Sequence, residues 1–162
     1  MDILEHPNPA LKQTALPVDP RTDKQLPRLV KAMARTMHEA PGVGLAATQV
    51  GVQKRVIVFD VDDGTVALCN PQIVQRSEET ELDDEGCLSL PGITVPVERA
   101  VSCVCEALDL KGEPLRLEVE GFVARVLQHE TDHLDGILII DRASTDDRRA
   151  AMRRYREQGE SL

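Results

Sequence analysis

The sequence predicts an α+β fold in which mostly antiparallel sheets surround a central helix, with a further helix toward each end of the chain. Strand-like runs rich in β-branched residues fill the middle of the chain, one helical pattern precedes them and two follow. Helices and strands therefore do not alternate as in parallel βαβ units. The length of 162 residues and the 41% hydrophobic content fit one domain, 1–162, and the scarcity of aromatic residues makes its core mainly aliphatic.

The first forty residues predict an extended arm followed by a helix. Four prolines within residues 1–20 favour a turn-rich arm wrapped on the domain. Thr22 or Asp23 is placed to cap a helix that continues to about Ala40. Pro27 falls in its first turn, where proline is best tolerated. The apolar residues at helical spacing are Leu26, Leu29, Val30, Met33 and Met37.

Residues 41–51 predict a loop containing GVGLAATQVG, and strand signals begin directly after it. KRVIVFDV (54–61) ends at an Asp62-Asp63-Gly64 turn, and TVALCN and QIVQR predict two strands separated by Pro71. Residues 77–92, SEETELDDEGCLSLPG, are acidic at first and then apolar. Another strand is expected within residues 94–110, TVPVERAVSCVCEALDL. A turn at 111–114 leads to the strand-like run LRLEV. Helices are expected over residues 120–134, with Gly136 as the stop, and over about 145–158.

Composition and charge narrow the classes of function. The net charge of −9 argues against general or sequence-specific nucleic-acid binding. The start MDILEHPNPALK lacks the basic and apolar regions of a signal peptide. No apolar run approaches the roughly 20 residues of a membrane span. We therefore expect a soluble, cytoplasmic protein that does not associate with membranes.

The four cysteines do not predict a disulfide framework in a reducing cytosol. Cys103 and Cys105 are two residues apart in a strand-like run, so they share one sheet face with Val101. Cys69 lies at the end of another apolar run. These three are expected to be buried free thiols, whereas Cys87 has neighbours that suggest a different role.

A metal-binding pattern lies in the predicted helix 120–134. His129 and His133 are four residues apart, so both imidazoles project from one helix face and can share a metal ion. Glu130 is adjacent, in the place that a general base takes in the H-E-x-x-H pattern. The same pattern could arise from two histidines without a shared function. However, the apolar residues before them place both histidines on the buried face of the helix, where polar groups without partners are costly, and metal binding would remove that cost.

A catalytic metal site needs a third protein ligand and an open position. No histidine follows His133, which leaves Glu157 or Glu160 downstream and Cys87 upstream. Cys87 is the better candidate, because a thiolate is a strong ligand for Fe(II), Zn or Ni. Gly86 permits an unusual backbone geometry or a close approach directly before it.

Three segments resemble the signature motifs of the peptide deformylase family, in that family's order. They are GVGLAATQ at 42–49, EGCLS at 85–89 and QHETDHL at 128–134. The opening ILEHPNPALK and the following helix are similar to the family too, so the resemblance runs from about Ile3 to Arg154. It implies metal-dependent hydrolysis of the N-formyl group from the formyl-methionine of new polypeptides, with release of formate.

The resemblance also implies roles for individual residues. Cys87, His129 and His133 would hold one divalent metal, naturally Fe(II), although Zn, Ni or Co could occupy the same ligands. Glu130 would be the general base, and the Gln49 amide and Leu88 N–H would stabilise the developing oxyanion. Substrate main chain would pair with the first-motif loop and Gly86. The residues of this chain that are expected to bind the substrate are Val43, Gly44, Gly86, Phe122 and Val126. The His129 ring would form a further wall of the methionine pocket.

Two alternatives stay open at this point. One is a zinc endopeptidase of the broader H-E-x-x-H type, which would need a third ligand other than Cys87. The other is a deformylase-like binding protein without activity, which should lack Glu130 or Gln49, yet both are present. The chain also lacks the arginine that some relatives carry near Thr94 to hold the substrate backbone, so the resemblance gives no expectation for substrate contacts beyond methionine.

Two charged features give further expectations. Arg125 lies four residues before His129 and should pair with Asp83 or Glu85 at the pocket edge, or else extend to solvent. Six arginines within residues 142–156 reverse the acidic balance of the chain and suggest that the C-terminal helix docks on the ribosome, whose surface is largely RNA phosphate. The alternative is a solvated helix packed through Ala150, Met152 and Tyr155.

Overall fold

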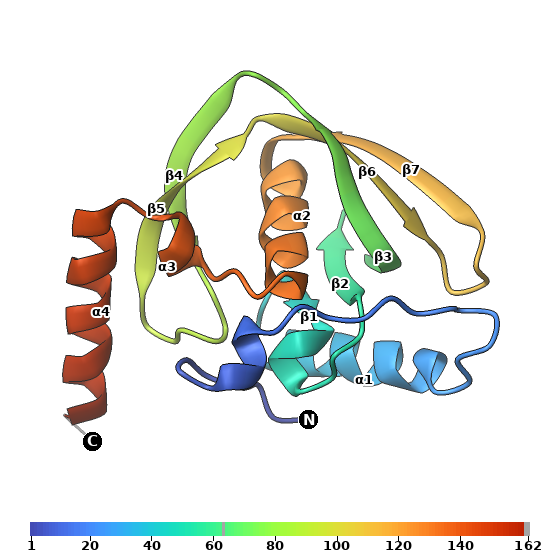
Figure 1. Cartoon of the computed structure of the whole chain (residues 1–162), viewed down its shortest axis with the longest axis horizontal. Helices are drawn as coiled ribbons and strands as arrows, with labels where there is room; N and C mark the ends of the chain where they lie inside the picture. Colours follow the sequence, from blue (N-terminus) through green and yellow to red (C-terminus); the bar gives the residue numbers. More distant parts are fainter. Residues whose placement is uncertain (63, 161–162) are drawn as a thin grey trace.

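A computed structural model describes residues 1–62 and 64–160 and confirms the α+β fold class (Figure 1). Its helices are α1 (Leu26–Glu39), α2 (Gly121–Leu134), α3 (Ile139–Arg142) and α4 (Thr145–Glu160), with 3-10 turns η1 (Pro9–Lys12) and η2 (Ala47–Val50). Its strands are β1 (Gly44–Ala46), β2 (Val56–Val61), β3 (Gly64–Arg76), β4 (Thr80–Gly86), β5 (Thr94–Ala100), β6 (Ser102–Leu108) and β7 (Pro114–Glu120).

Within the described residues, all strand pairs are antiparallel. One sheet has the order β1-β2-β3-β6-β7, and β4 pairs with β5 in a second sheet. Figure 1 shows α2 upright at the centre, with β4 and β5 on one side and the larger sheet on the other. Leu127 and Leu134 of α2 pack with Ile57, Phe59 and Leu68 of that sheet. The core on the other side joins β5 to α3 and α4 through Val95, Val97, Ile139, Ile140 and Ala151.

Helix α1 begins a few residues later than expected. The Thr22 and Asp23 N–H groups both donate to the Asp19 main-chain oxygen, and Asp23 in turn accepts from Leu26 N–H, so residues 19–25 form turns before the helix. Gln25 is the N-cap residue, and Pro27 lies in the first turn as predicted.

The prediction of two strands separated by Pro71 is wrong, because β3 runs through that residue. Proline has no N–H for the ladder, and the register with β6 shifts between Cys69 and Gln72. Asn70 has a positive φ of 51° and donates its N–H to the Arg55 main-chain oxygen. The chain therefore bends at a bulge instead of ending the strand.

Further details of the fold differ from the predictions or were not predicted from the sequence. The segment 94–110 holds two strands that belong to different sheets, β5 and β6. The acidic stretch is strand β4, although acidic residues are poor strand formers. The loop at 41–51 contains β1 and η2, and α3 was not foreseen. The expected turn at Asp62-Asp63-Gly64 includes Asp63, which lies outside the described residues.

Three of the four cysteines lie in the core, and the helices are those of a protein without a membrane span in its described residues. Cys69, Cys103 and Cys105 are buried free thiols, as predicted. Burial raises the pKa of both the Cys69 and the Cys105 thiols to about 11, so they stay protonated and unreactive. Over the described parts of the chain, no helix combines the length and apolar character needed to cross a bilayer.

Candidate active site

Helix α2 carries both histidines of the motif, and the segment after β4 brings Cys87 to them. The ligand atoms of Cys87, His129 and His133 all lie within 4.8 Å of one another. The His133 Nε2 is 3.0 Å from the His129 Nε2 and 3.5 Å from the Cys87 Sγ. Three electron-rich atoms that converge in this way fit a single metal ion. Burial lowers the pKa of His133, which favours the neutral imidazole that binds metal.

Glu130 lies beside this cluster and is only 4% exposed. Its Oε2 is 4.0 Å from the His129 Nε2, and its Oε1 is buried without a hydrogen-bond partner among the described residues. Burial raises the pKa of Glu130 to about 7, which suits a group that accepts and returns a proton near neutral pH. A Cβ at Gly44 would lie 2.5 Å from the Glu130 Oε2, so any other residue there would displace the Glu130 carboxylate.

The Gln49 side chain is held in one orientation. Its Oε1 accepts from the Ala46 N–H at 3.0 Å, so its amide nitrogen points toward Cys87. That nitrogen lies 3.7 Å from the Cys87 Sγ and donates to the Ser89 Oγ at 3.1 Å. Gln49 and Ser89 are both buried. A neutral amide donor is thus fixed at the edge of the metal-binding cluster.

A cavity of about 720 Å³ opens onto the cluster, and every residue that we expected to contact substrate lines it. Val126 is buried, whereas Val43 is 48% and Phe122 is 65% exposed. The last two side chains therefore belong to the rim of the cavity and not to its floor. The lining residues among those predicted are Val43, Gly44, Gly86, Phe122, Val126 and His129, together with Gln49, Cys87, Leu88 and Glu130.

The prediction for Arg125 is confirmed with Glu85 as its partner. The Arg125 Nη1 is 2.5 Å from the Glu85 Oε2, and the same guanidinium donates to the main-chain oxygens of Glu81 and Val97. Asp83, the other candidate, is exposed. Because Glu85 also accepts from the His129 Nδ1 at 2.9 Å, the arginine supports the carboxylate that orients a metal-ligand histidine.

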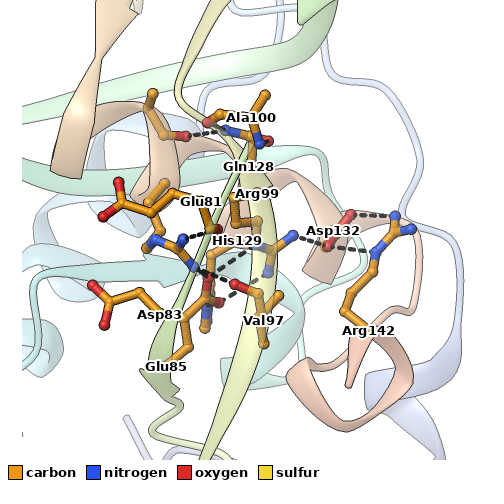
Figure 2. Close-up of polar contacts among 12 residues, drawn as sticks. Glu81, Asp83, Glu85, Val97, Arg99, Ala100, Gln128, His129, Asp132 and Arg142 are labelled. Atoms are coloured by element: carbon orange, nitrogen blue, oxygen red, sulfur yellow. Dashed lines mark hydrogen bonds and ion pairs between the residues drawn. The ribbon is translucent and has the colours of Figure 1, made fainter. Parts of the chain in front are cut away.

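Arg99 is a component of the site that the sequence analysis missed. It is 6% exposed and donates to both Glu85 oxygens, at 2.9 and 3.0 Å, and to Asp132 at 2.6 Å. Asp132 also accepts two hydrogen bonds from Arg142. Figure 2 shows this chain of charges running from Arg142 to His129. One feature of the sequence could have indicated this role: in the strand TVPVERA, Arg99 alternates with Val95 and Val97 and so points toward the interior.

The network keeps Glu85 ionised in spite of its burial. Burial acts to raise the pKa of Glu85, but the hydrogen bonds from His129 and Arg99 outweigh it and lower the pKa to about 2. An ionised carboxylate accepts the His129 Nδ1–H, so Nε2 is the His129 atom that faces the cluster. Without a metal, burial acts to lower the pKa of His129, but the hydrogen bonds with Cys87 and Glu85 outweigh it and raise the pKa to about 10, so metal binding through Nε2 must displace a proton.

We expect Arg99→Met to weaken metal binding by roughly 10- to 100-fold, the usual cost of losing a partner of a ligand histidine. The substitution leaves Glu85 and Asp132 buried without their shared cation. The measurement is a metal-binding titration, with Arg116→Met as the control because that arginine is 53% exposed and pairs only with surface carboxylates. Equal affinities for the two variants would contradict this role.

The fold and the cluster define a class: a helix-borne H-E-x-x-H site with a cysteine in place of the third histidine or carboxylate, as in a mononuclear metal-dependent hydrolase. The convergence on Cys87 favours this residue over Glu157, which lies on α4. The alternative ligand Glu160 has a side chain outside the described residues. Comparison with known proteins then identifies the family.

A family model of polypeptide deformylases matches residues 1–149. The curated peptide deformylase of Acidothermus cellulolyticus is 49% identical over 150 residues, which are 93% of this chain and 82% of that protein. The structure of a peptide deformylase from Synechococcus elongatus in complex with actinonin has a TM-score of 0.90 and 36% identity, and covers 95% of this chain and 86% of that one. A Met-Ala-Ser-bound peptide deformylase from Acinetobacter baumannii has a TM-score of 0.84 and 38% identity, over 88% and 97% of the chains.

The chain therefore belongs to the polypeptide deformylase family, metal-dependent hydrolases that remove the N-formyl group from nascent peptides. The resemblance noted in the sequence is thereby confirmed, and so is the enzymatic class. The endopeptidase alternative finds no support, because the family model and the relatives are all deformylases.

Proposed function

We propose that Cys87, His129 and His133 hold one divalent metal at which this chain hydrolyses the formyl amide of N-formyl-methionyl peptides. The observation that carries the proposal is the convergence of these three ligand atoms within 4.8 Å beside the buried Glu130 carboxylate, whose Oε1 has no hydrogen-bond partner among the described residues. When bound, the metal supplies a Lewis acid that activates water and polarises the formyl carbonyl. We propose Fe(II) as the natural metal, and Zn, Ni or Co also suit one thiolate and two imidazoles.

Glu130 moves the proton in this scheme. Its carboxylate takes a proton from the attacking water as the new bond to the formyl carbon forms. The same group then gives that proton to the methionine nitrogen, so the carbon–nitrogen bond breaks and formate leaves beside a free amine. Its raised pKa of about 7 supports both steps, because the carboxyl group can hold and release a proton near neutrality.

The charge that develops on the formyl oxygen needs fixed donors. We propose the Gln49 side-chain amide and the Leu88 main-chain N–H for this role. Gln49 is neutral, so it donates without competing as a base. Leu88 directly follows Cys87, so a metal on that thiolate would fix the position of the Leu88 N–H as well.

Gln49→Ala is expected to lower kcat by about 10²–10³-fold, the typical cost of losing one oxyanion donor. The metal content should stay the same, since Gln49 is not among the three converging ligands. Gln53→Ala is a suitable control, because the Gln53 amide donates to the Ala10 main-chain oxygen instead. Steady-state hydrolysis of formyl-Met-Ala-Ser measures both variants, and an unchanged kcat in Gln49→Ala would remove Gln49 from the mechanism.

The cavity suggests how the substrate is held. An extended peptide can pair its main chain with the Gly44 segment and Gly86, which explains tolerance of many sequences after methionine. The methionine side chain would lie against Val126 and the His129 ring, with Val43 and Phe122 at the rim. The Acinetobacter relative binds Met-Ala-Ser, which supports a short methionyl peptide as the ligand of this chain.

We propose that α4 docks on the ribosome through its exposed arginines. Ala151 is buried, and Met152 and Tyr155 pack against the same apolar cluster, so that face of α4 is covered. Arg149, Arg153 and Arg156 are exposed, whereas Arg148 pairs with Asp141 and Arg154 donates to the Thr94 main-chain oxygen. Exposed guanidinium groups suit RNA phosphate.

Charge reversal at Arg149, Arg153 and Arg156 is expected to weaken ribosome binding at low salt by at least about ten-fold, because each reversed guanidinium replaces attraction to RNA phosphate with repulsion. Hydrolysis of a free formyl peptide should not change. Reversal of Arg28, Arg35 and Arg116, which are also exposed, changes the net charge equally and serves as the control. If both triple variants bind ribosomes as the unmodified protein does, α4 is not the docking element.

A further inference from the structure

Residues 3–6 of the N-terminal arm contact the main chain at Gln49 and at Ser89, next to the two proposed oxyanion donors. The Leu4 N–H donates to the Gln49 main-chain oxygen at 2.7 Å, and the His6 N–H donates to the Ser89 main-chain oxygen at 2.9 Å. In an extended segment, alternate N–H groups point to the same side. The arm therefore joins two loops that are forty residues apart in the sequence, each of which supplies one proposed donor.

A side-chain contact closes this arrangement. The Gln49 Nε2 donates to the Ser89 Oγ at 3.1 Å, and Ser89 has no exposed surface. Three hydrogen bonds thus join the arm, Gln49 and Ser89 in a closed ring next to the two proposed donors. A shift of the arm would move the main chain at Gln49 and at Ser89, and Ser89 is the next residue after Leu88.

Contacts with α4 and with two apolar clusters hold residues 3–6 in place. The Tyr155 hydroxyl donates to the His6 main-chain oxygen at 2.7 Å, and the two rings lie 6.0 Å apart between centroids. Leu4 packs against the apolar cluster that contains Leu90, and Ile3 packs against the cluster on α1. In Figure 1 the arm, in dark blue, lies between α4 and η2, the turn that contains Gln49.

We propose that residues 3–6 are a positioning segment that sets the Gln49 amide and the Leu88 N–H at the distance the transition state needs, and that Tyr155 of α4 locks this segment. The inference rests on the proposed function of Gln49 and Leu88. Oxyanion donors act only when they are preorganised, and catalytic groups need placement to within about 0.5 Å. None of residues 3–6 lines the cavity itself, so we expect the segment to act on the placement of the donors and not on substrate binding.

The test compares Leu4→Pro with Leu4→Ala. Both variants lose the leucine side chain, but only proline also removes the N–H that bonds to Gln49. Relative to Leu4→Ala, we expect Leu4→Pro to lower kcat for formyl-Met-Ala-Ser by about ten-fold, less than the roughly 10²–10³-fold loss of a whole donor. KM and the affinity for the product Met-Ala-Ser should stay within about two-fold, since uniform binding is untouched. Glu5→Pro, which removes an N–H that donates to neither Gln49 nor Ser89, should resemble Leu4→Ala.

A double variant tells this proposal from the proposed function. If the arm acts through Gln49, adding Leu4→Pro to Gln49→Ala should cost less than about three-fold, because coupled residues are not additive. Full additivity would overturn the positioning role and leave the role of Gln49 intact. Full activity in Gln49→Ala alone would overturn both.

Tyr155→Phe provides a second variant in case Leu4→Pro does not fold. It removes only the hydroxyl that bonds to His6. We expect kcat to fall about two- to three-fold with KM unchanged and with the melting temperature close to that of the unmodified protein, as for loss of an interaction that matters only in the transition state. A kcat equal to that of the unmodified protein, or equal kcat values for Leu4→Pro and Leu4→Ala, would overturn the proposal.

Discussion

Glu130→Ala is expected to keep the metal and to lose about 10²–10⁴-fold in kcat, the range that general acid–base catalysis usually contributes. The metal should stay because the cluster of converging ligands is Cys87, His129 and His133. The turnover should fall because Glu130, the buried carboxylate next to that cluster, is the group that we propose to transfer the proton. Metal content by elemental analysis and kcat for formyl-Met-Ala-Ser, measured on one preparation, test both parts.

The control for Glu130→Ala is Glu118→Ala, which removes a carboxylate whose side chain is 74% exposed on β7. It should retain full turnover and a full metal complement. Glu130→Gln keeps the volume and shape of the side chain but cannot accept a proton, so it should be as inactive as alanine. Near-normal turnover in either metal-loaded Glu130 variant would rule out the proton-transfer role.

Cys87→Ala is expected to lose most of the metal and, with it, nearly all activity. Removal of the thiolate leaves only the two histidines of α2, and two protein ligands are fewer than catalytic sites of this type use. Cys103→Ala is the control, since Cys103 is a buried free thiol of β6 that is not part of the cluster. Dialysis followed by elemental analysis, with activity measured before and after metal is added back, gives the result.

The outcome for Cys87→Ala also bears on the alternative enzyme class. A zinc endopeptidase of the broader H-E-x-x-H type would use another third ligand and would keep its metal without Cys87. Full metal occupancy and full activity in Cys87→Ala would therefore contradict the assignment of Cys87 as a ligand. A matching loss of metal and activity would support it.

Helices and the residues on their faces could be predicted well, because a helix repeats its spacing every three or four residues of the sequence. The four-residue spacing of His129 and His133 placed both on one face of α2, and the apolar spacing from Leu26 to Met37 identified α1. An ion pair of Arg125 with Asp83 or Glu85 was also predicted, because a metal shared by Cys87 and His129 brings the acidic run before Cys87 to the helix. The structure selects Glu85.

Features that depend on long-range pairing could not be read from the sequence. Strand β4 is acidic and mostly exposed, and it is a strand because β5 pairs with it along its whole length. Strand alternation puts Arg99 on the inward face of β5 with Val95 and Val97, but only the fold shows that it lies between Glu85 and Asp132. The contacts of Leu4 and His6 with Gln49 and Ser89 join segments with no shared pattern.

The most direct test of the central claim is hydrolysis of formyl-Met-Ala-Ser compared with acetyl-Met-Ala-Ser by the metal-reconstituted protein. The two peptides differ by one methyl group at the acyl carbon, and a close-fitting site at the metal accepts hydrogen there more readily than methyl, by a few kcal/mol. We predict rapid release of formate, no detectable release of acetate under the same conditions, and no cleavage between methionine and alanine. Equal rates for the two peptides, or cleavage of the Met-Ala bond, would contradict the account.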